Sequence, residues 1–479
     1  MGEVSALVEP LFRLLGREMV VVGRDELAAA AHDALRRSRG SAAGLRPAAL
    51  PLAIVRPRET ADVAAVVRFA GENRLPVVEL GGGTGLMGGA RSLAPGIVLD
   101  LGSMNRIVEI IPEDRTARVQ AGVVLEVLDR ALGEHGLMLG HDPWTVPVAT
   151  VGGTISTNGL GYRGAQYGSM GDQVLGVEVV LGDGSVLRTR AAARSSVGPQ
   201  LKRLFIGAEG TIGVITEAVL RVFPQPERRL LHPLEFPDFD TGFRAVEACF
   251  AVGLVPAMVD FGQTYQGPRD GAEPFTPAGA PGRLQLAFEG FAEGVEAASG
   301  RALAICRRND GTLLPSEQAQ EFWDQRHVVA ERFRERRPEP EGEDHDSWLP
   351  AGVYFDFVHV ALPASRVLTC RDQAATMMRR HGVSVVEWGL WNQPELFSVV
   401  VQRHVENAGD AAAFARAVDD LLRLAQDLGG SMEYCHGAGL RLAPLMAREH
   451  GHGLDLLRAI KRQADPEAIL NPGKLDLGA

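Results

Sequence analysis

Six glycines in nine positions distinguish the segment Gly81–Gly89, which reads Gly-Gly-Gly-Thr-Gly-Leu-Met-Gly-Gly and follows an apolar strand-like run. Glycine is favoured where the backbone must approach a ligand closely. Consecutive exposed amides in such a loop form a concave site that binds anions, and a pyrophosphate suits it well. A simple tight connection between two strands does not need so many glycines. We therefore expect this loop to bind the phosphates of a cofactor.

The same loop contains a dinucleotide-binding pattern, because Gly83–Gly88 matches G-x-G-x-x-G. In a nicotinamide-binding Rossmann fold this pattern opens a helix, and the helix N-terminus holds the pyrophosphate. Here the seven residues Ala90–Gly96, which include Pro95, separate the loop from the next strand. They are too few to form that helix. The pattern predicts strand–loop–strand, which disfavours a nicotinamide enzyme.

Three glycine-rich segments together resemble a known family. They are Gly81–Gly89, then Pro143–Gly159 with its continuation to Tyr167-Gly168, and finally Gly207–Glu217. In this order they resemble the FAD-binding domain of the vanillyl-alcohol oxidase family, in the branch of the D-lactate dehydrogenases, glycolate oxidases and alkyldihydroxyacetonephosphate synthases. The resemblance implies an α+β fold, with a PCMH-type FAD-binding domain of two subdomains and an α+β cap domain built on an antiparallel sheet.

Composition and periodicity indicate the domain boundaries, and the resemblance implies what each domain is. We expect an N-terminal helical segment at 1–45, an FAD-binding domain at 46–224, a cap or substrate domain at 225–430, and a C-terminal segment at 431–479 that returns to the FAD domain. The run Pro224-Gln-Pro-Glu227 marks the second boundary. Within the FAD domain, Gly182-Asp-Gly184 predicts a hairpin that joins strands at 174–181 and 185–190. The apolar spacing of 59–73 predicts a helix.

The resemblance also implies which residues bind FAD. Small residues let the backbone lie against a flat ring, and backbone N–H groups with hydroxyls satisfy its polar edges. The residues expected to bind FAD are Gly81, Gly82, Gly83, Thr84, Gly85, Leu86, Gly88, Gly89, Pro143, Thr150, Val151, Gly152, Gly153, Ser156, Thr157, Gly159, Tyr162, Glu209, Gly210, Ile215 and Asn471.

The attachment of FAD is a separate question. Some relatives bond FAD covalently to a histidine in the first glycine loop, but no histidine lies between residues 33 and 134 here. We therefore expect non-covalent FAD, while attachment from a cap residue stays open.

The segment Glu433-Tyr-Cys-His-Gly-Ala-Gly439 resembles the Glu-His-Gly-x-Gly segment of the D-2-hydroxy-acid dehydrogenases. The resemblance implies that His436 is the catalytic base beside the flavin. Histidine changes its charge near neutral pH, so it can take a hydroxyl proton while hydride leaves to flavin N5. Tyr434 is interpreted as a second acid–base group or a flavin-facing hydrogen-bond donor, with a packed aromatic as the alternative.

The same dehydrogenases bind a divalent metal, but their ligands are missing here. The glutamate before the base is replaced by Cys435, and Glu387–Phe397 stands where the cap should supply two histidines. We therefore expect no metal site. The sequence shows no basic partner for Cys435, so no reactive thiol is expected. His327 and His359 stand alone and are interpreted as structural.

Arg326 closes the segment Phe322-Trp-Asp-Gln-Arg326 at the start of a long helical stretch. This segment resembles a helix of the same branch whose arginine binds a substrate carboxylate or phosphate. A guanidinium suits either anion, so we expect Arg326 to bind a small, anionic substrate. The alternative is an exposed helix arginine.

Composition excludes some classes of partner. The formal net charge of −11 argues against a broad nucleic-acid surface. Four well-separated cysteines and no recognisable leader fit a cytoplasmic protein. No apolar run reaches the roughly 18 residues of a membrane span. By analogy with the fold, a homodimer is expected.

Three functions remain at this stage. The first is an FAD-dependent oxidoreductase, an oxidase or a dehydrogenase, that oxidises the hydroxyl-bearing carbon of a 2-hydroxy acid or related alcohol. The second is a flavin-dependent transferase that resembles the ether-lipid synthases. The third is a non-catalytic FAD-binding subunit of a larger oxidase, which retention of His436 disfavours.

Overall fold

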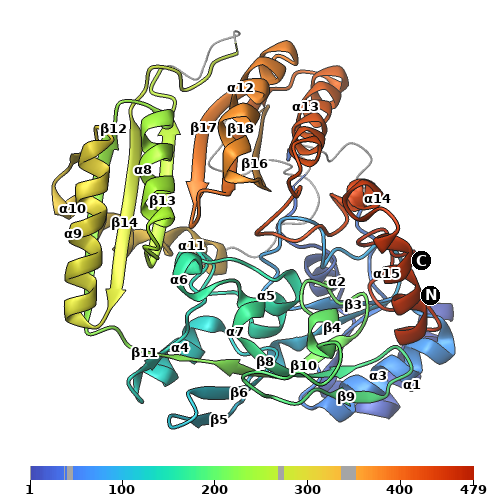
Figure 1. The fold of residues 1–479 in the computed structure, drawn as a ribbon. Coiled ribbons are helices and arrows are strands. Elements are labelled where there is room, and N and C mark those ends of the chain that lie inside the picture. The colour runs from blue at the N-terminus through green and yellow to red at the C-terminus, as the bar shows by residue number, and fades with distance from the viewer. Residues whose placement is uncertain (1, 37, 40–46, 268–273, 336–351, 479) are drawn as a thin grey trace.

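The computed structural model describes residues 2–36, 38–39, 47–267, 274–335 and 352–478. Figure 1 shows two parts, a lower one that contains the glycine loops and an upper one built on a single large sheet. This is the mixed α and β architecture predicted from sequence.

A four-stranded sheet in the lower part carries the first glycine loop. Its order is β1-β2-β4-β3, with β2, β4 and β3 parallel and β1 antiparallel to β2. The strands are β1 (Val20–Val21), β2 (Ala53–Val55), β3 (Val77–Leu80) and β4 (Ile97–Asp100). Helix α3 (Thr60–Asn73) connects β2 to β3 and buries Val63, Val66 and Val67, as the apolar spacing predicts.

A five-stranded antiparallel sheet forms the rest of the lower part, in the order β5-β6-β10-β8-β9. Its strands are β5 (Ile107–Ile111), β6 (Thr116–Gln120), β8 (Val174–Val180), β9 (Val186–Arg188) and β10 (Val214–Arg221). Strands β8 and β9 form the predicted hairpin, with Val180 opposite Val186. Short helices join these strands: α4 (Leu125–Gly133), α5 (Val151–Thr157), α6 (Gly164–Tyr167) and α7 (Met170–Gln173).

The two sheets share one hydrophobic core, and the N-terminal residues belong to it. Leu11, Val20, Val66 and Val179 are all nearly inaccessible within this single cluster. The helical segment expected at 1–45 also contains a strand. The chain forms α1 (Gly2–Leu15) and α2 (Arg24–Ala30), but the β-branched pair of β1 between them adds a strand to the first sheet. Residues 40–45 lie outside the described ones.

The upper part is a seven-stranded antiparallel sheet in the order β15-β12-β14-β13-β17-β18-β16. Its strands are β12 (Arg228–Phe236), β13 (Met258–Thr264), β14 (Gly282–Gly290), β15 (Thr312–Leu313), β16 (Val353–Ala361), β17 (Ser384–Trp391) and β18 (Leu396–His404). Just before β12 in the chain, β11 (Phe223–Pro224) pairs with the much earlier β7 (Leu137–Met138). We propose the domain boundary at 224–225, because β12 starts the new sheet.

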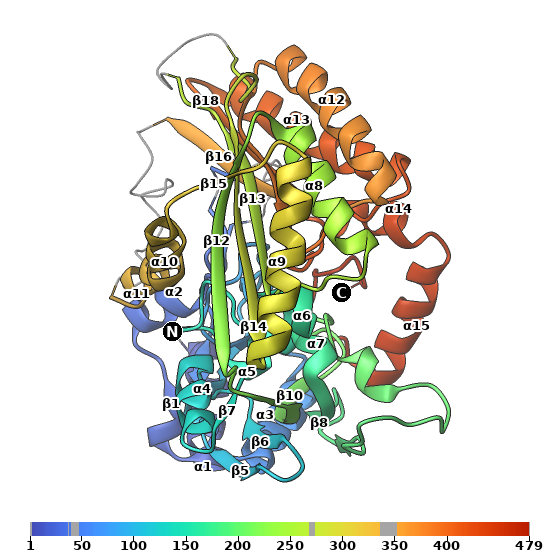
Figure 2. The same ribbon diagram turned by 60° about the vertical axis from the view of Figure 1, so that its left-hand side comes forward.

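Helices cover the two faces of this sheet unequally (Figure 2). The core on one face contains residues of α8 (Phe239–Ala251), α9 (Ala292–Arg308), α12 (Ala364–Arg380) and α13 (Ala408–Asp427). The other face packs Trp323 of α10 (Ser316–Gln325), which α11 (Val328–Glu335) follows. That second face also packs against Tyr162 of the glycine-rich domain.

After α13 the chain runs back across the first domain through α14 (Met446–His450) and α15 (Gly453–Ala464). Near its end, Leu470 bridges to Val77 of β3. Among the described residues, no helix combines the length and the apolar character needed to cross a bilayer.

Candidate active site

The first glycine loop joins β3 to β4 without an intervening helix, as predicted. Residues 81–85 are partly exposed, whereas residues 86–88 are buried. Within the described part of the chain, the N–H groups of residues 82–88 donate no hydrogen bond. The loop therefore offers the run of available amides that an anion needs.

This loop is pressed against the segment that leads into α5. A Cβ at Gly81 would lie 2.5 Å from Oγ1 of Thr150, and one at Gly82 would overlap the carbonyl oxygen of Val148. Glycine is required at both positions because the two backbones approach so closely. Thr150 caps α5, since its Oγ1 accepts a hydrogen bond from the N–H of Gly153 at 3.3 Å. Two segments predicted to bind FAD thus lie side by side.

The other residues predicted to bind FAD fall into two groups. The side chains of Val151 and Ile215 are buried in the core of the domain, so only their backbone can face a cofactor. Pro143, Gly152 and Gly210 are also buried. The small or polar residues that keep some exposure are Gly153, Ser156, Thr157, Gly159 and Tyr162.

Asn471 ties three chain segments together. Its Nδ2 donates to the carbonyl oxygen of Gly89 at 2.7 Å and to that of Glu209 at 2.6 Å. The Glu209 carboxylate in turn accepts the N–H groups of Ala438 and Gly439 at 2.8 and 2.9 Å. Burial raises the pKa of Glu209 to about 7, although these two hydrogen bonds oppose the shift. The first loop, the 207–213 loop and the C-terminal segment are therefore held in one unit.

Two buried polar side chains near these loops have no hydrogen-bond partner among the described residues. Both carboxylate oxygens of Glu79, just before the first loop, and both ring nitrogens of His141 are unsatisfied. Burial raises the pKa of Glu79 to about 8 and lowers that of His141 to about 4. Buried polar groups are normally satisfied, so these atoms are consistent with an adjacent polar ligand. Together with the two backbone cradles, the residues present fit FAD.

Glu433 and His436 form the centre of the catalytic segment. One carboxylate oxygen of Glu433 accepts the N–H groups of Tyr434, Cys435 and His436 at 3.0, 2.7 and 3.0 Å. The other oxygen lies 3.5 Å from Nδ1 of His436, which makes this an electrostatic contact. Burial alone would raise the pKa of Glu433, but the attraction of His436 and these hydrogen bonds lower it overall. The charged carboxylate therefore fixes the histidine backbone and polarises its ring.

His359, interpreted from sequence as structural, lies against this segment. It belongs to β16, and its ring centroid is 4.6 Å from that of His436 and 5.2 Å from that of Tyr434. Burial, reinforced by the neighbouring His436, lowers the pKa of His359 to about 3. His359 is therefore a neutral imidazole at physiological pH.

Tyr434 and two further aromatic side chains line the same region. The Tyr434 hydroxyl is 3.3 Å from the hydroxyl of Ser398, and burial raises its pKa well above the usual value. Tyr434 is thus a neutral phenol, suited to donating a hydrogen bond. Trp391 contacts His359 at 6.4 Å and Tyr162 at 5.5 Å between ring centroids.

Arg326 is already paired within the protein. Its Nε donates to Asp142 at 3.1 Å and its Nη1 to the carbonyl oxygen of Trp323. His327 also contacts Asp142, at 3.0 Å. Burial would raise the pKa of Asp142, but Arg163, His327 and Arg326 lower it strongly overall. The geometry makes Arg326 part of a clamp between the cap and the FAD domain, and its predicted role in anion binding stays a prediction.

The wall of the cap sheet near Tyr162 carries two acidic side chains that sequence reasoning missed. Asp260 on β13 and Glu387 on β17 project from the face turned toward the FAD domain, and the Thr264 hydroxyl donates to Glu387 at 2.6 Å. Burial and the charge of Glu387 raise the pKa of Asp260 to about 7. This wall favours hydroxyl donors over anions.

The structure also groups possible metal ligands. His359, Cys435 and His436 each place one ligand atom within 4.8 Å of the others. His359 was missed because a lone histidine carries no spacing signal. A weak signal existed, since this histidine interrupts the otherwise apolar run Phe357-Val-His-Val-Ala361 of a buried strand. Burial and the charge of Glu433 raise the pKa of Cys435, so its thiol is protonated.

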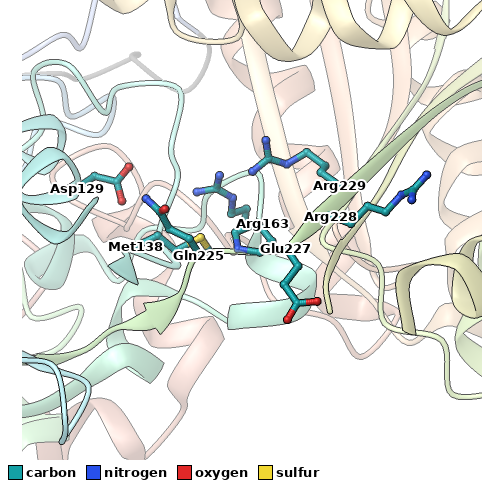
Figure 3. Close-up of a pocket in the computed structure, with 8 residues that line it drawn as sticks. Asp129, Met138, Arg163, Gln225, Glu227, Arg228 and Arg229 are labelled. Carbon is teal, nitrogen blue, oxygen red and sulfur yellow. The ribbon is translucent and has the colours of Figure 1, made fainter. Parts of the chain in front are cut away.

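A separate cavity of about 340 Å³ lies at the linker between the two domains (Figure 3). None of its lining residues belongs to the glycine loops or the histidine cluster. Arg163 and Arg229 pair with Glu289 at 3.0 and 2.8 Å, and Arg228 pairs with Glu296 at 2.9 Å. Its arginines are thus committed to structural ion pairs.

Comparisons with known families agree with this geometry. The FAD binding domain family matches residues 51–190, and the family of FAD linked oxidases, C-terminal domain, matches residues 225–475. The second match spans more than half of the chain.

Individual proteins show the same likeness. The glycolate oxidase subunit GlcD of Bacillus subtilis is 29% identical over 434 residues, which is 89% of each chain. The D-2-hydroxyglutarate dehydrogenase of Xanthomonas citri pv. viticola is 31% identical over 436 residues, also 89% of each. A solved alkyldihydroxyacetonephosphate synthase superposes with a TM-score of 0.76 at 17% identity and covers 98% of this chain and 84% of its own. That superposition shows the fold alone.

Proposed function

This chain belongs to the FAD-linked oxidases of the vanillyl-alcohol oxidase superfamily, and we propose that it oxidises the hydroxyl-bearing carbon of a small 2-hydroxy acid or related alcohol. It is an FAD-dependent oxidoreductase. Bound FAD supplies the hydride acceptor. The glycine loops around Gly82 and Gly153 and the side chain of Asn471 hold the cofactor non-covalently.

The observation that carries this proposal is the pairing of Glu433 with His436. A carboxylate beside Nδ1 favours the tautomer with the proton on that nitrogen, which leaves Nε2 free to accept one. His436 is therefore the base that takes the proton of the substrate hydroxyl. Glu433 stabilises the positive charge that the ring then carries.

Two neutral groups position the substrate beside this base. Tyr434, whose raised pKa keeps it protonated, donates a hydrogen bond to a substrate oxygen. His359 packs against both rings and limits their movement. This packing keeps the ring of His436 in a defined orientation, and a well-oriented base lowers the entropic cost of the reaction.

The substrate class is supported by the relatives and by the pocket. The glycolate oxidase subunit and the D-2-hydroxyglutarate dehydrogenase are named for 2-hydroxy acids. The charge of Glu387 repels an anionic group, so we place the acidic end of the substrate on the side of Arg326, whose guanidinium also pairs with Asp142. The hydroxyl groups of the substrate face the acidic wall.

The test is anaerobic titration of the purified, FAD-loaded protein with glycolate, D-lactate, L-lactate, D-2-hydroxyglutarate and simple alcohols. A 2-hydroxy acid is expected to bleach the flavin absorption. Where that acid is chiral, its opposite enantiomer is expected to leave the flavin oxidised. The H436N variant is expected to keep its FAD and bleach far more slowly.

Other outcomes separate the alternatives. A substrate that perturbs the flavin spectrum without bleaching it would indicate the redox-neutral transferase chemistry. If no compound of the panel changes the flavin spectrum although dithionite still reduces the flavin, the protein would be a subunit that receives its electrons from a partner. Either result would contradict the proposal.

A further inference from the structure

Three side chains beside the proposed base form a compact set of nitrogen and sulfur ligands. His359 comes from β16, and Cys435 and His436 come from the segment after α13. Their ligand atoms all lie within 4.8 Å of one another. All three residues keep partial exposure.

The types of ligand decide which ion fits. Two imidazoles and one thiolate suit Zn²⁺, and a site with three protein ligands leaves a fourth position for water. Zinc bonds of this kind place ligand atoms about 3.5 Å apart in a tetrahedron. The ligand atoms lie within 4.8 Å of one another, so binding requires the cluster to contract, and the Cys435 thiol to give up its contact with the carbonyl oxygen of Leu160.

The surroundings already orient the ligands. Glu433 contacts Nδ1 of His436 at 3.5 Å and so leaves the other nitrogen for an ion. Metal-binding histidines commonly use one nitrogen in this way against a carboxylate. Nδ1 of His359 is buried and makes no hydrogen bond within the described part of the chain. A bound cation would also offset the negative charge of Glu433.

This set differs from the one that the family resemblance implies. Those dehydrogenases use a glutamate and two cap histidines, and the only shared position here is Cys435, where a thiol replaces the carboxylate. The absence of that set led to the expectation of no metal. That reasoning did not include His359, which reaches the site through the tertiary fold.

We propose that His359, Cys435 and His436 bind one Zn²⁺ ion, and that the bound ion inhibits the enzyme. On binding, the thiol proton passes to water and a sulfur–zinc bond forms. Zinc binding stands on the ligand geometry alone. The inhibition rests on the proposed function, because the ion occupies the nitrogen of His436 that would otherwise accept the substrate proton.

Calorimetric titration of the chelator-treated, FAD-loaded protein with Zn²⁺ tests the site. One ion is expected to bind to the wild type. C435S and H359N are each expected to weaken zinc binding at least about tenfold. Loss of a residue that only hydrogen-bonds to a metal ligand already weakens binding by about that factor, so loss of a ligand itself should cost no less. H452N alters a fully exposed histidine and is expected to bind as the wild type does. Mg²⁺, which prefers oxygen ligands, is expected not to compete.

Cobalt provides a second readout. With Co²⁺ the wild type is expected to show a thiolate charge-transfer band that C435S lacks, in difference spectra that subtract the flavin. Flavin content and thermal unfolding of both variants establish that they are folded. The zinc site is wrong if the wild type binds no zinc, or if both C435S and H359N bind it with wild-type affinity. If zinc binds at the site while flavin reduction continues unchanged, the assignment of His436 as base fails instead.

Discussion

The rings of His359 and His436 lie with their centroids 4.6 Å apart, although one belongs to cap strand β16 and the other to the segment that returns from the cap to the FAD domain. The contact completes the catalytic segment from a distant part of the chain. Glu433 contacts His436 as well, through its backbone N–H and Nδ1. The proposed base is therefore held by residues of two different chain segments before any substrate binds.

Replacing His436 by asparagine is expected to slow flavin reduction by about 100- to 10,000-fold, the usual contribution of a positioned base. The mutation leaves the glycine loops untouched, so FAD content is expected to stay at the wild-type level. Anaerobic stopped-flow measurement of flavin bleaching gives the rate. H452N, at a fully exposed histidine, is the matched control. Reduction of H436N at the wild-type rate would remove His436 from the mechanism.

The FAD domain was the most predictable region. The loop of residues 81–89 was predictable from its own composition. Its many glycines indicate that another backbone segment approaches closely, and such an approach occurs at Gly82. The hairpin of β8 and β9 also followed from a local turn motif. Such features depend on neighbours in sequence, so local composition specifies them.

The active site was predictable only in part. His436 was recognised through its own segment, but His359 and Asp260 reach the site through pairings of β16 and β13 that no local pattern encodes. The pairing of Arg326 with Asp142 is likewise a contact between two domains. Long-range partners decide whether such a charge is available to a ligand, and a single sequence does not reveal them.

Asn471 is expected to stabilise both the fold and FAD binding. Its Nδ2 donates to the carbonyl oxygens of Gly89 and Glu209, and aspartate at this position keeps the shape but cannot donate. N471D is expected to lower the free energy of unfolding by roughly 1–3 kcal/mol, because two buried carbonyls lose their donor. Thermal unfolding and retention of FAD after gel filtration measure the effect. Wild-type values in both would show that Asn471 does not join these loops.

Gly82 provides a test of the first loop with a natural control. A Cβ there would overlap the carbonyl oxygen of Val148, whereas one at Gly300 of α9 meets nothing within 4 Å. G82A is expected to cost about 1–3 kcal/mol of stability through overpacking and to lose most bound FAD. G300A is expected to be neutral or to gain up to about 1 kcal/mol, because alanine favours the helix. FAD retention by G82A at the level of G300A would contradict the placement of the cofactor against this loop.

Asp260 is expected to make stability depend on pH. Burial and the charge of Glu387 raise the pKa of Asp260 from 3.8 to about 7, so the folded state favours the protonated acid. Its favourable contribution to stability is complete below about pH 4 and is lost as the pH rises toward 7. D260N cannot ionise, so above pH 7 it is expected to be more stable than the wild type by on the order of 1–3 kcal/mol, with little difference at pH 4.

Unfolding by denaturant at both pH values gives the comparison, and D114N at an exposed turn is the control. An equal difference between D260N and wild type at pH 4 and pH 8 would show that Asp260 ionises normally and that the acidic wall is solvated.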